Sequence, residues 1–364
     1  MIPAEYYYSI YLLIVSLITF PYTARYLRMS PNRVDKSLEV DYSKVIALTI
    51  FMILFIGLRP VSDVFADMPG YAKAMLDHRF EDLPIAWDQN YIFQPMMAFL
   101  SSIGASQQTP IVILAAINFG ATFFAMKKMF PNDTMLAMLV FFGAFSTFCG
   151  ATNGLKAGCA MAFFLLALAY RENKVLCVLF LFLTMGYHHS MQLPLAAFIL
   201  CTFYKNTKLY FAFWIICLFI AALHITFFMN FFAGWTDDHG AEYLYTLAGS
   251  RDSEFSGKLG FRYDFIIYSS VPIIIGYIGL FKKKIISENY QFLLNLYLFV
   301  NGIWMLCMYA NFTNRIAGLS WGMLPVLIIY PFLKEKWNNN QYKTLYKVVI
   351  GHLSFTLFMQ IIYY

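Results

Sequence analysis

Long runs of apolar residues, separated by short charged clusters, dominate the chain. Most of these runs have roughly the 15 to 22 residues with which an α-helix crosses the hydrocarbon core of a bilayer. They cover residues 6–22, 45–58, 109–126, 134–151, 155–170, 174–187, 190–203, 208–229, 263–281, 290–310, 315–333 and 345–362. The pattern therefore predicts an all-α polytopic membrane protein with about 12 transmembrane helices.

The apolar stretch 91–104 differs from the others because it is short and contains Gln94 and Pro95. A segment of this length does not span a bilayer, and its polar interruption needs protein around it. We predict a short interfacial or re-entrant helix here. We expect this short helix and the predicted spans to form a single transmembrane domain over residues 1–364.

Composition supports the membrane class. The 364 residues are 60% hydrophobic and only 13% charged, with a mean hydropathy of +0.61, which exceeds what a soluble core accounts for. Only Glu5 precedes the first apolar run, so the N-terminal segment is expected to be a retained span and not a cleaved signal. The six cysteines show no C-x-x-C spacing and are expected to be packing residues.

The distribution of basic residues predicts the orientation, because lysine and arginine collect in cytoplasmic loops. One set of alternate loops, which includes Arg25, Lys127 and Lys282, holds 18 of the 26 basic residues and is predicted to be cytoplasmic. The opposite side, with both termini, is predicted to be the outer side of the membrane. It carries the two long loops 59–108 and 230–262, which we expect to form the roof of an active site.

Arginine is more frequent than lysine among the basic residues of the outer loops, whereas lysine is more frequent on the cytoplasmic side. Their eight basic residues are Arg59, Lys73, Arg79, Lys156, Arg251, Lys258, Arg262 and Arg315, against thirteen acidic residues in the same loops. A planar guanidinium grips phosphate through two hydrogen bonds, so these arginines indicate specific anion sites and not a general basic surface. The net charge of +6 comes from the cytoplasmic side, which suits lipid headgroups and argues against nucleic acid as a partner.

No Walker-type or Gly-x-Gly-x-x-Gly motif occurs in the chain, which argues against ATP and sugar nucleotides as substrates. No H-E-x-x-H or comparable pattern of metal ligands occurs either. Asp237, Asp238 and His239 read as a solvated loop run. We therefore expect neither a metal nor a cofactor.

The first candidate motif consists of Arg59, Asp63, Asp67 and Tyr71, spaced four apart. In a helix these side chains would share one face, although Pro60 and Pro69 interrupt a continuous helix. An arginine for an anionic leaving group, beside a carboxylate that accepts a hydroxyl proton, is what glycosyl transfer needs. The alternatives are a salt-bridged loop and an arginine that snorkels at a helix end.

Two further motifs stand at the outer ends of spans. Asn153 and Lys156 precede small residues that permit close helix packing, and the lysine is a candidate phosphate ligand. His188 and His189 are a candidate base or a donor to phosphate. For both motifs the alternative is anchoring at the membrane interface.

The last two motifs place arginines at predicted helix starts, where the helix dipole favours an anion. One contains Arg262 and Tyr263, with Arg251 shortly before it, and the other contains Asn314 and Arg315. They repeat the arrangement of Arg59. Three arginines at outer helix boundaries make snorkelling a weaker explanation for the set.

Together these motifs resemble the EpsG-type and Wzy-type polysaccharide polymerases, which include bacterial O-antigen polymerases. The resemblance is carried in order by Gly57–Tyr71, Asn153–Ala162, Tyr187–Ser190 with Pro194, Gly260–Phe265 before Tyr268–Pro272, and Asn314–Ala317 with Ser320, Trp321 and Pro325. Lys156 departs from the pattern, since many members carry arginine there, which leaves its contact with phosphate open.

The resemblance implies a GT-C-like glycosyltransferase of the bacterial inner membrane. It would join oligosaccharide repeat units carried on undecaprenyl pyrophosphate, which serves as donor and acceptor, with membrane lipid and a chain-length regulator protein as further partners. Arg59, Arg262 and Arg315, with Arg251 and Lys156, would stabilise the departing pyrophosphate. Asp63, Asp67, His188 and His189 remain alternatives for the base, and the substrate-binding candidates are Tyr71, Asn153, Tyr263 and Asn314.

Three other functions remain open on the sequence. An O-antigen ligase would need a similar site. A flippase for lipid-linked oligosaccharides would need a polar path through both leaflets, for which His224 and Asn295 are the candidates. A membrane O-acyltransferase would need a cytoplasmic histidine and arginine constellation that the chain lacks.

Overall fold

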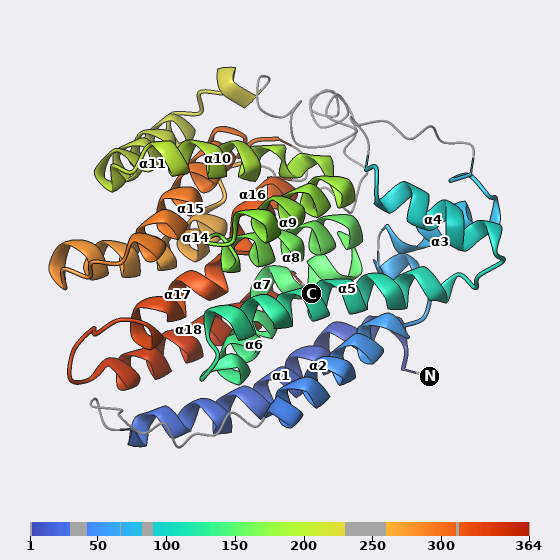
Figure 1. Cartoon of the computed structure of the whole chain (residues 1–364), viewed down its shortest axis with the longest axis horizontal. Helices are drawn as coiled ribbons and strands as arrows, with labels where there is room; N and C mark the ends of the chain where they lie inside the picture. Colours follow the sequence, from blue (N-terminus) through green and yellow to red (C-terminus); the bar gives the residue numbers. More distant parts are fainter. Residues whose placement is uncertain are drawn as a thin grey trace. The chain divides into compact units, whose positions relative to one another are not determined.

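The computed structural model consists of α-helices joined by turns and by short 3₁₀ and π segments (Figure 1). It describes residues 2–29, 42–65, 67–81, 90–229, 260–310 and 313–363, and these ranges contain no strand. The all-α prediction is confirmed. The physical reason is that a backbone in lipid must satisfy its own hydrogen bonds, which an apolar run achieves by forming a helix.

The chain divides into two compact units. The first comprises Met1–His188 with Phe332–Tyr364, and the second comprises His189–Pro331. Each unit carries some of the candidate residues.

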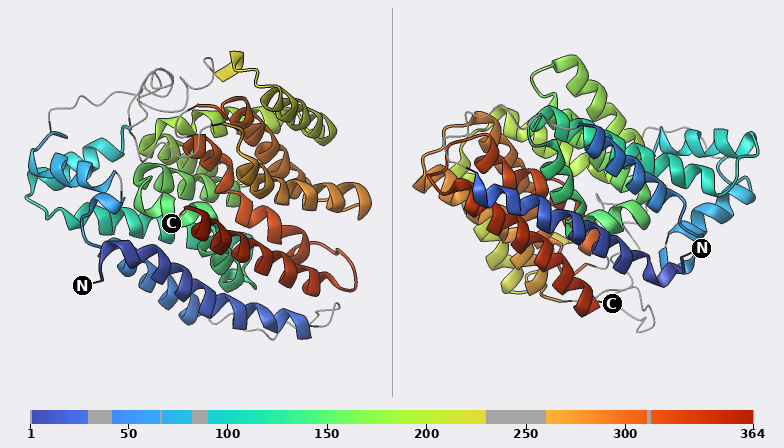
Figure 2. Two further views of the ribbon diagram at one scale, coloured as in Figure 1. Left: turned by 180° about the vertical axis from the view of Figure 1, so that it is seen from behind. Right: turned by 90° about the horizontal axis from the view of Figure 1, so that it is seen from below.

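The first unit is organised around α5 (Gln108–Met129), which packs against α2 (Tyr42–Gly57) and α8 (Leu155–Ala169). Helix α8 also packs against α9 (Lys174–Tyr187), and α1 (Tyr7–Ala24) runs alongside α18 (Gln341–Tyr363), as Figure 2 shows from two directions. The other elements of this unit are η1 (Ala4–Tyr6), η2 (Arg25–Arg28), η3 (Asp63–Phe65), α3 (Met68–Leu76), α4 (Phe93–Ser102), α6 (Thr134–Phe142) and α7 (Phe145–Thr152).

Glycines allow the closest helix crossings in the first unit. A Cβ on Gly57 would lie 3.0 Å from Val112 Cα of α5. A Cβ on Gly158 of α8 would lie 2.6 Å from Asn118 Nδ2 of α5 and would overlap the Gly150 carbonyl of α7. Small residues let helix backbones approach in this way. The close packing predicted from the small residues after Lys156 is therefore confirmed at Gly158.

The second unit is built around α15 (Glu288–Leu306), whose residues from Phe292 to Leu306 are buried on nearly all sides. Helix α15 packs against α10 (Gln192–Phe203), α11 (Thr207–Ala222), α14 (Tyr263–Tyr277) and α16 (Thr313–Trp321). Two short segments, η4 (His189–Met191) and the π-helical η6 (Ile278–Lys282), and α17 (Leu324–Leu333) complete the described elements of the unit.

A buried polar network ties the helices of the second unit together. The Asn301 side chain donates to Ser269 Oγ at 3.1 Å and to Ser320 Oγ at 3.0 Å, and its oxygen accepts from Trp214 Nε1 at 2.8 Å. These residues belong to α15, α14, α16 and α11. Side chains that hydrogen-bond between helices replace the hydrophobic drive that is missing in lipid.

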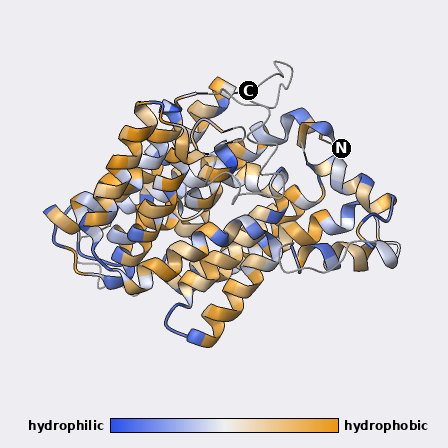
Figure 3. Cartoon of the chain, turned by 90° about the horizontal axis from the view of Figure 1, so that it is seen from above, coloured by the Kyte–Doolittle hydropathy of each residue, from blue (hydrophilic) through white to orange (hydrophobic). Residues whose placement is uncertain are grey.

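The helices confirm a polytopic membrane protein. Among the residues that the structure describes, five helices are long and apolar enough to cross a bilayer, namely those spanning Ala4–Arg28, Gln108–Met129, Tyr263–Lys282, Thr313–Leu333 and Gln341–Ile362. Large apolar side chains point outward, among them Phe203 at 83% exposure, and Figure 3 shows hydrophilic residues mainly at helix ends and connections. The count of about 12 crossings and the GT-C-like class remain predictions.

Some predicted spans differ in detail. The run 134–151 forms two helices, α6 and α7, bent by 74° around Gly143, so it is a broken or re-entrant span. Helix α11 ends at Ala222 and not at residue 229, and His224 beyond it has a left-handed φ of 57°. The short segment 91–104 contains α4, whose 10 residues fit the predicted short helix.

Candidate functional site

Arg59 follows α2 and is completely buried, with 0% exposure. Its guanidinium donates to the Ile56 carbonyl at 2.7 Å and to the Thr152 carbonyl at 2.9 Å. These carbonyls lie at the C-terminal ends of α2 and α7, where the helix dipole is negative. A snorkelling arginine keeps its charged group in water, so that explanation is wrong for Arg59.

The backbone around Arg59 is held as firmly as its side chain. The Gln108 side chain, at the start of α5, donates to the Arg59 carbonyl at 3.1 Å and also to the Gly57 carbonyl. The Phe65 ring lies 5.1 Å from Arg59 Cζ. Arg59 is therefore fixed between three helices.

The charge of Arg59 is not neutralised by any described residue, since no carboxylate in the described ranges forms an ion pair with it. Its Nε is buried and has no hydrogen-bond partner in the described part of the chain. Burial lowers the pKa of the guanidinium to about 10, and the nearby Tyr7 partly opposes this shift. Arg59 is therefore a buried cation at neutral pH, and such a charge attracts an anion.

The spacing of four from Arg59 to Tyr71 does not place these residues on one helical face. Arg59 lies in an irregular segment, Asp63 begins η3, Asp67 is the N-cap of α3 and Tyr71 lies within α3. The breaks follow from the prolines: Pro60 stands in the irregular segment, and Pro69 occupies the first turn of α3, where its ring is tolerated. Asp63 is exposed, whereas Asp67 and Tyr71 are half-buried.

Phe93, at the start of α4, connects the first two motifs. Its ring lies 5.5 Å from the Tyr71 ring in an edge-on arrangement and 5.7 Å from Lys156 Nζ. A cation over an aromatic face is attracted by the ring quadrupole. Phe93 is not among the candidates predicted from the sequence, where the short apolar segment 91–104 is the only pattern that includes it.

Asn153 occupies the junction between α7 and α8, directly after Thr152, whose carbonyl accepts from Arg59. Asn153 Oδ1 is buried and has no hydrogen-bond partner within the described part of the chain. A buried acceptor without a donor is costly. The junction therefore offers an acceptor for a hydroxyl group next to the arginine anchor.

His188 is buried at the end of α9, with 8% exposure. Two residues earlier, the Gly186 carbonyl accepts from the Ile92 backbone N–H at 2.8 Å, and a Cβ on Gly186 would overlap Ile92. The segment that leads into Phe93 thus crosses this end of α9. In the first unit, the motif of Arg59 to Tyr71, the motif of Asn153 and Lys156, and the end of α9 with His188 thus all meet the segment around Phe93. The half-buried His189 begins the second unit.

Arg262 caps the start of α14 in the second unit and is buried, with 5% exposure. Its Nε and Nη2 donate to the two carboxylate oxygens of Asp264, at 3.0 and 2.8 Å. Its Cζ lies 3.4 Å from the centroid of the Phe265 ring. Gly260, with φ of 113°, directs the chain into this start, a conformation that favours glycine. Arg262 is thus positioned by a carboxylate and a ring, and its neighbour Tyr263 is 71% exposed.

Aromatic residues join the start of α14 to the start of α16. The ring centroids of Phe265 and Trp304 lie 6.2 Å apart, and Trp304 Nε1 donates to Thr313 Oγ1 at 2.9 Å. Thr313 begins α16, whose first turn carries the exposed Asn314 and Arg315. The prediction that Arg262 and Arg315 stand at helix starts is confirmed, and the helix dipoles there add positive potential.

Four residues named from the sequence lie in a part of the chain that the structure does not describe. Arg251 lies outside the described residues, as do Asp237, Asp238 and His239. Within the ranges that the structure describes, no group of three or more potential metal ligands occurs. The expectation of a site without metal stays a prediction.

Comparison with known proteins assigns the chain to a family. The model of the EpsG family matches residues 44–364, a range that contains all candidate residues of both units. No curated protein and no solved structure matches the chain. This membrane protein belongs to the EpsG family, which is associated with polysaccharide polymerisation, a glycosyl transfer activity.

Proposed function

We propose that this protein is a glycosyltransferase that polymerises oligosaccharide repeat units carried on undecaprenyl pyrophosphate. Donor and acceptor would both be lipid-linked, and the reaction would take place at the periplasmic face of the bacterial inner membrane. The product would be O-antigen or a related capsular or extracellular polysaccharide. Membership of the EpsG family supports the reaction class.

The observation that carries the proposal is the state of Arg59. It is a fully buried cation held by backbone carbonyls, with no carboxylate counter-ion from the described residues. A preorganised positive charge in a site from which water is excluded stabilises negative charge that develops on a leaving group. A departing pyrophosphate carries such charge.

The other candidates fit supporting roles in this reaction. Arg262 and Arg315, at helix starts, would add positive potential, and Lys156 beside Phe93 would act as a point-charge ligand for phosphate. Asn153, with its unpartnered acceptor, would bind a sugar hydroxyl. Asp63, Asp67, His188 and His189 are the candidates for the base that takes the acceptor proton.

Deletion of the gene, followed by gel electrophoresis of surface polysaccharide, tests the proposal. If the protein is a polymerase, the deletion strain should show a single repeat unit where the wild type shows a ladder. Complete loss of repeats would identify a flippase, and full-length polymer that stays on its lipid carrier would identify a ligase. Unchanged length with altered acylation would identify an acyltransferase.

The proposed face of the membrane has its own test. Reporter enzymes fused after Glu81, in the first long loop, and after Lys283, in the connection from α14 to α15, should report the periplasm and the cytoplasm respectively. A cytoplasmic signal from the Glu81 fusion would contradict a periplasmic site, because Arg59 and Glu81 belong to the same loop.

A further inference from the structure

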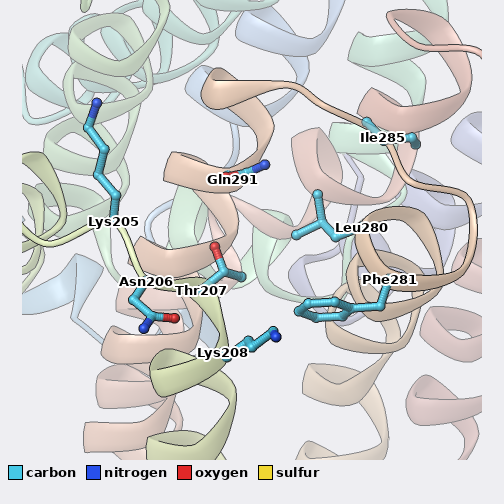
Figure 4. A pocket seen from close by; sticks show the side chains of 8 residues that line it. All are labelled: Lys205, Asn206, Thr207, Lys208, Leu280, Phe281, Ile285 and Gln291. Carbon is cyan, nitrogen blue, oxygen red and sulfur yellow. The ribbon is translucent and has the colours of Figure 1, made fainter.

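The second unit contains a cavity of about 390 Å³ away from the arginine motifs (Figure 4). It lies where the connection from α10 to α11 meets η6 and the start of α15. The residues that matter for its chemistry are Lys205, Thr207, Lys208, Leu280, Phe281 and Gln291. The lysine distribution predicts these helix ends to be cytoplasmic.

Thr207 gives the cavity an unsatisfied polar group. The residue is 91% buried, and its hydroxyl has no hydrogen-bond partner within the described chain. Figure 4 shows the hydroxyl on the side of Gln291, whose amide group also faces the cavity region. A buried hydroxyl without a partner is costly, so a ligand that accepts its hydrogen bond would stabilise this arrangement.

The start of α11 leaves its first backbone N–H groups without a side-chain cap. Asn206 is the N-cap of α11, and its carbonyl accepts from the Leu209 N–H at 3.0 Å, but its side chain makes no capping hydrogen bond. Asn173, the N-cap of α9, accepts from the Leu176 N–H at 3.1 Å. Uncapped N–H groups at a helix N-terminus, together with the dipole, form a site for an anion.

The charge around the cavity is positive. Lys208 lines it, is exposed and has no ion-pair partner among the described residues, and Lys205 faces Glu288 at 3.7 Å. Lys282, Lys283 and Lys284 follow Phe281 directly. One nearby acid against five lysines leaves the cavity attractive to an anionic group.

Exposed apolar residues next to the cavity indicate which anion binds. Ile286 is 90% exposed and Leu209 is 51% exposed. Phe211 and Phe281 form an aromatic pair with ring centroids 5.7 Å apart beside the cavity. Acyl chains can cover such residues, whereas a free ion cannot. We propose that this cavity binds the phosphate of an anionic phospholipid, through Lys208, the Thr207 hydroxyl and the α11 N-terminus.

The test measures lipid binding and is independent of polymerisation. The full-length protein, purified in a neutral detergent, is titrated with dioctanoyl phosphatidylglycerol, dioctanoyl phosphatidylcholine or inorganic phosphate, and its unfolding is followed by tryptophan fluorescence. A ligand that binds the folded state raises the melting temperature. The anionic lipid should raise it at lower concentration than phosphatidylcholine, and inorganic phosphate should have little effect.

Two variants locate the effect. Lys208→Gln, at an exposed position that leaves the core unchanged, should need about fivefold more phosphatidylglycerol for the same shift, a typical effect of one basic residue at an anionic surface. Thr207→Val should weaken binding further when combined with it. The matched control is Lys174→Gln, at the exposed first residue of α9, where the N-cap is already satisfied.

Three results would overturn the proposal. The first is a Lys208→Gln response equal to that of the wild type, and the second is equal stabilisation by phosphatidylcholine. The third is stabilisation by inorganic phosphate that equals the effect of the anionic lipid, which would assign the cavity to a free anion. If the double variant does not fold, Lys208→Gln alone and Lys208→Arg, which keeps the charge and should bind, decide the matter.

Discussion

The guanidinium of Arg59 donates a 2.9 Å hydrogen bond to the backbone carbonyl of Thr152, which lies 93 positions later in the chain. The bond joins the loop after α2 to the junction of α7 and α8, where Asn153 and Lys156 follow. Two motifs that the sequence presents separately thus share one anchor. The same cation holds two helix ends and presents positive charge, so its substitution should affect geometry and electrostatics together.

Arg59→Lys is expected to reduce polymerisation on the order of a hundredfold or more in rate, the usual effect of losing one preorganised donor. Lysine keeps the charge but lacks the planar fork that reaches the Ile56 and Thr152 carbonyls together. The measurement is the polysaccharide ladder from cells whose membranes contain equal amounts of wild-type and variant protein.

Arg79→Lys is the matched control for Arg59→Lys. Arg79 belongs to the same outer loop, but its side chain is 62% exposed and pairs with Asp77 at 2.8 Å. Surface ion pairs contribute little, so this variant should form wild-type ladders. Full-length ladders from Arg59→Lys would contradict a role of Arg59 in the active site.

Arg262→Lys and Asp264→Asn are expected to be energetically coupled. The carboxylate of Asp264 accepts from Nε and Nη2 of Arg262, so either substitution breaks the same bidentate pair. The second substitution should therefore lower the free energy of unfolding by less than the first. The coupling in the free energy of unfolding should lie at about 0.5–3 kcal/mol, as for residues in direct contact. A double-mutant cycle in detergent measures it, and strictly additive effects would show that the pair is not a unit in solution.

Phe93→Leu should lower activity several-fold, because the ring contacts both Tyr71 and Lys156. An aromatic pair contributes roughly 0.5–1.5 kcal/mol. A cation–π contact between a buried ring and a half-buried lysine contributes roughly 0.5–2 kcal/mol. Phe99→Leu is the control, since Phe99 lies on the same helix α4 but is 62% exposed. Equal activity of the two variants would show that Phe93 is not required to position the site.

Gly158→Ala should destabilise the first unit by about 1–3 kcal/mol, the usual cost of inserting a methyl group into a packed interface. The new Cβ would overlap the Gly150 carbonyl and crowd Asn118. Gly120→Ala in α5 is the control, because its Cβ would meet nothing within 4 Å, and alanine favours a helix. Thermal unfolding of both variants in detergent separates them, and a Gly158→Ala variant as stable as Gly120→Ala would contradict the close crossing.

The sequence by itself determined the class of the protein and the places where its helices lie. Apolar runs can only be helices in lipid, so each predicted run overlaps a helix of the structure. It also located Arg262 and Arg315 at helix starts, because helix boundaries follow the change from polar to apolar residues. It did not show the break at Gly143, because apolar residues continue through it on both sides.

Only the tertiary structure decided which residues meet. The Thr152 carbonyl as a partner of Arg59, and Phe93 between Tyr71 and Lys156, depend on how α2, α4, α7 and α8 pack. Hydropathy does not encode this packing, because residues that face lipid and residues that face protein are equally apolar in these helices. Every residue has a backbone carbonyl, so the sequence does not show which carbonyl accepts a hydrogen bond from Arg59. The residues that hold Arg59 could therefore be identified only once the helices were placed in space.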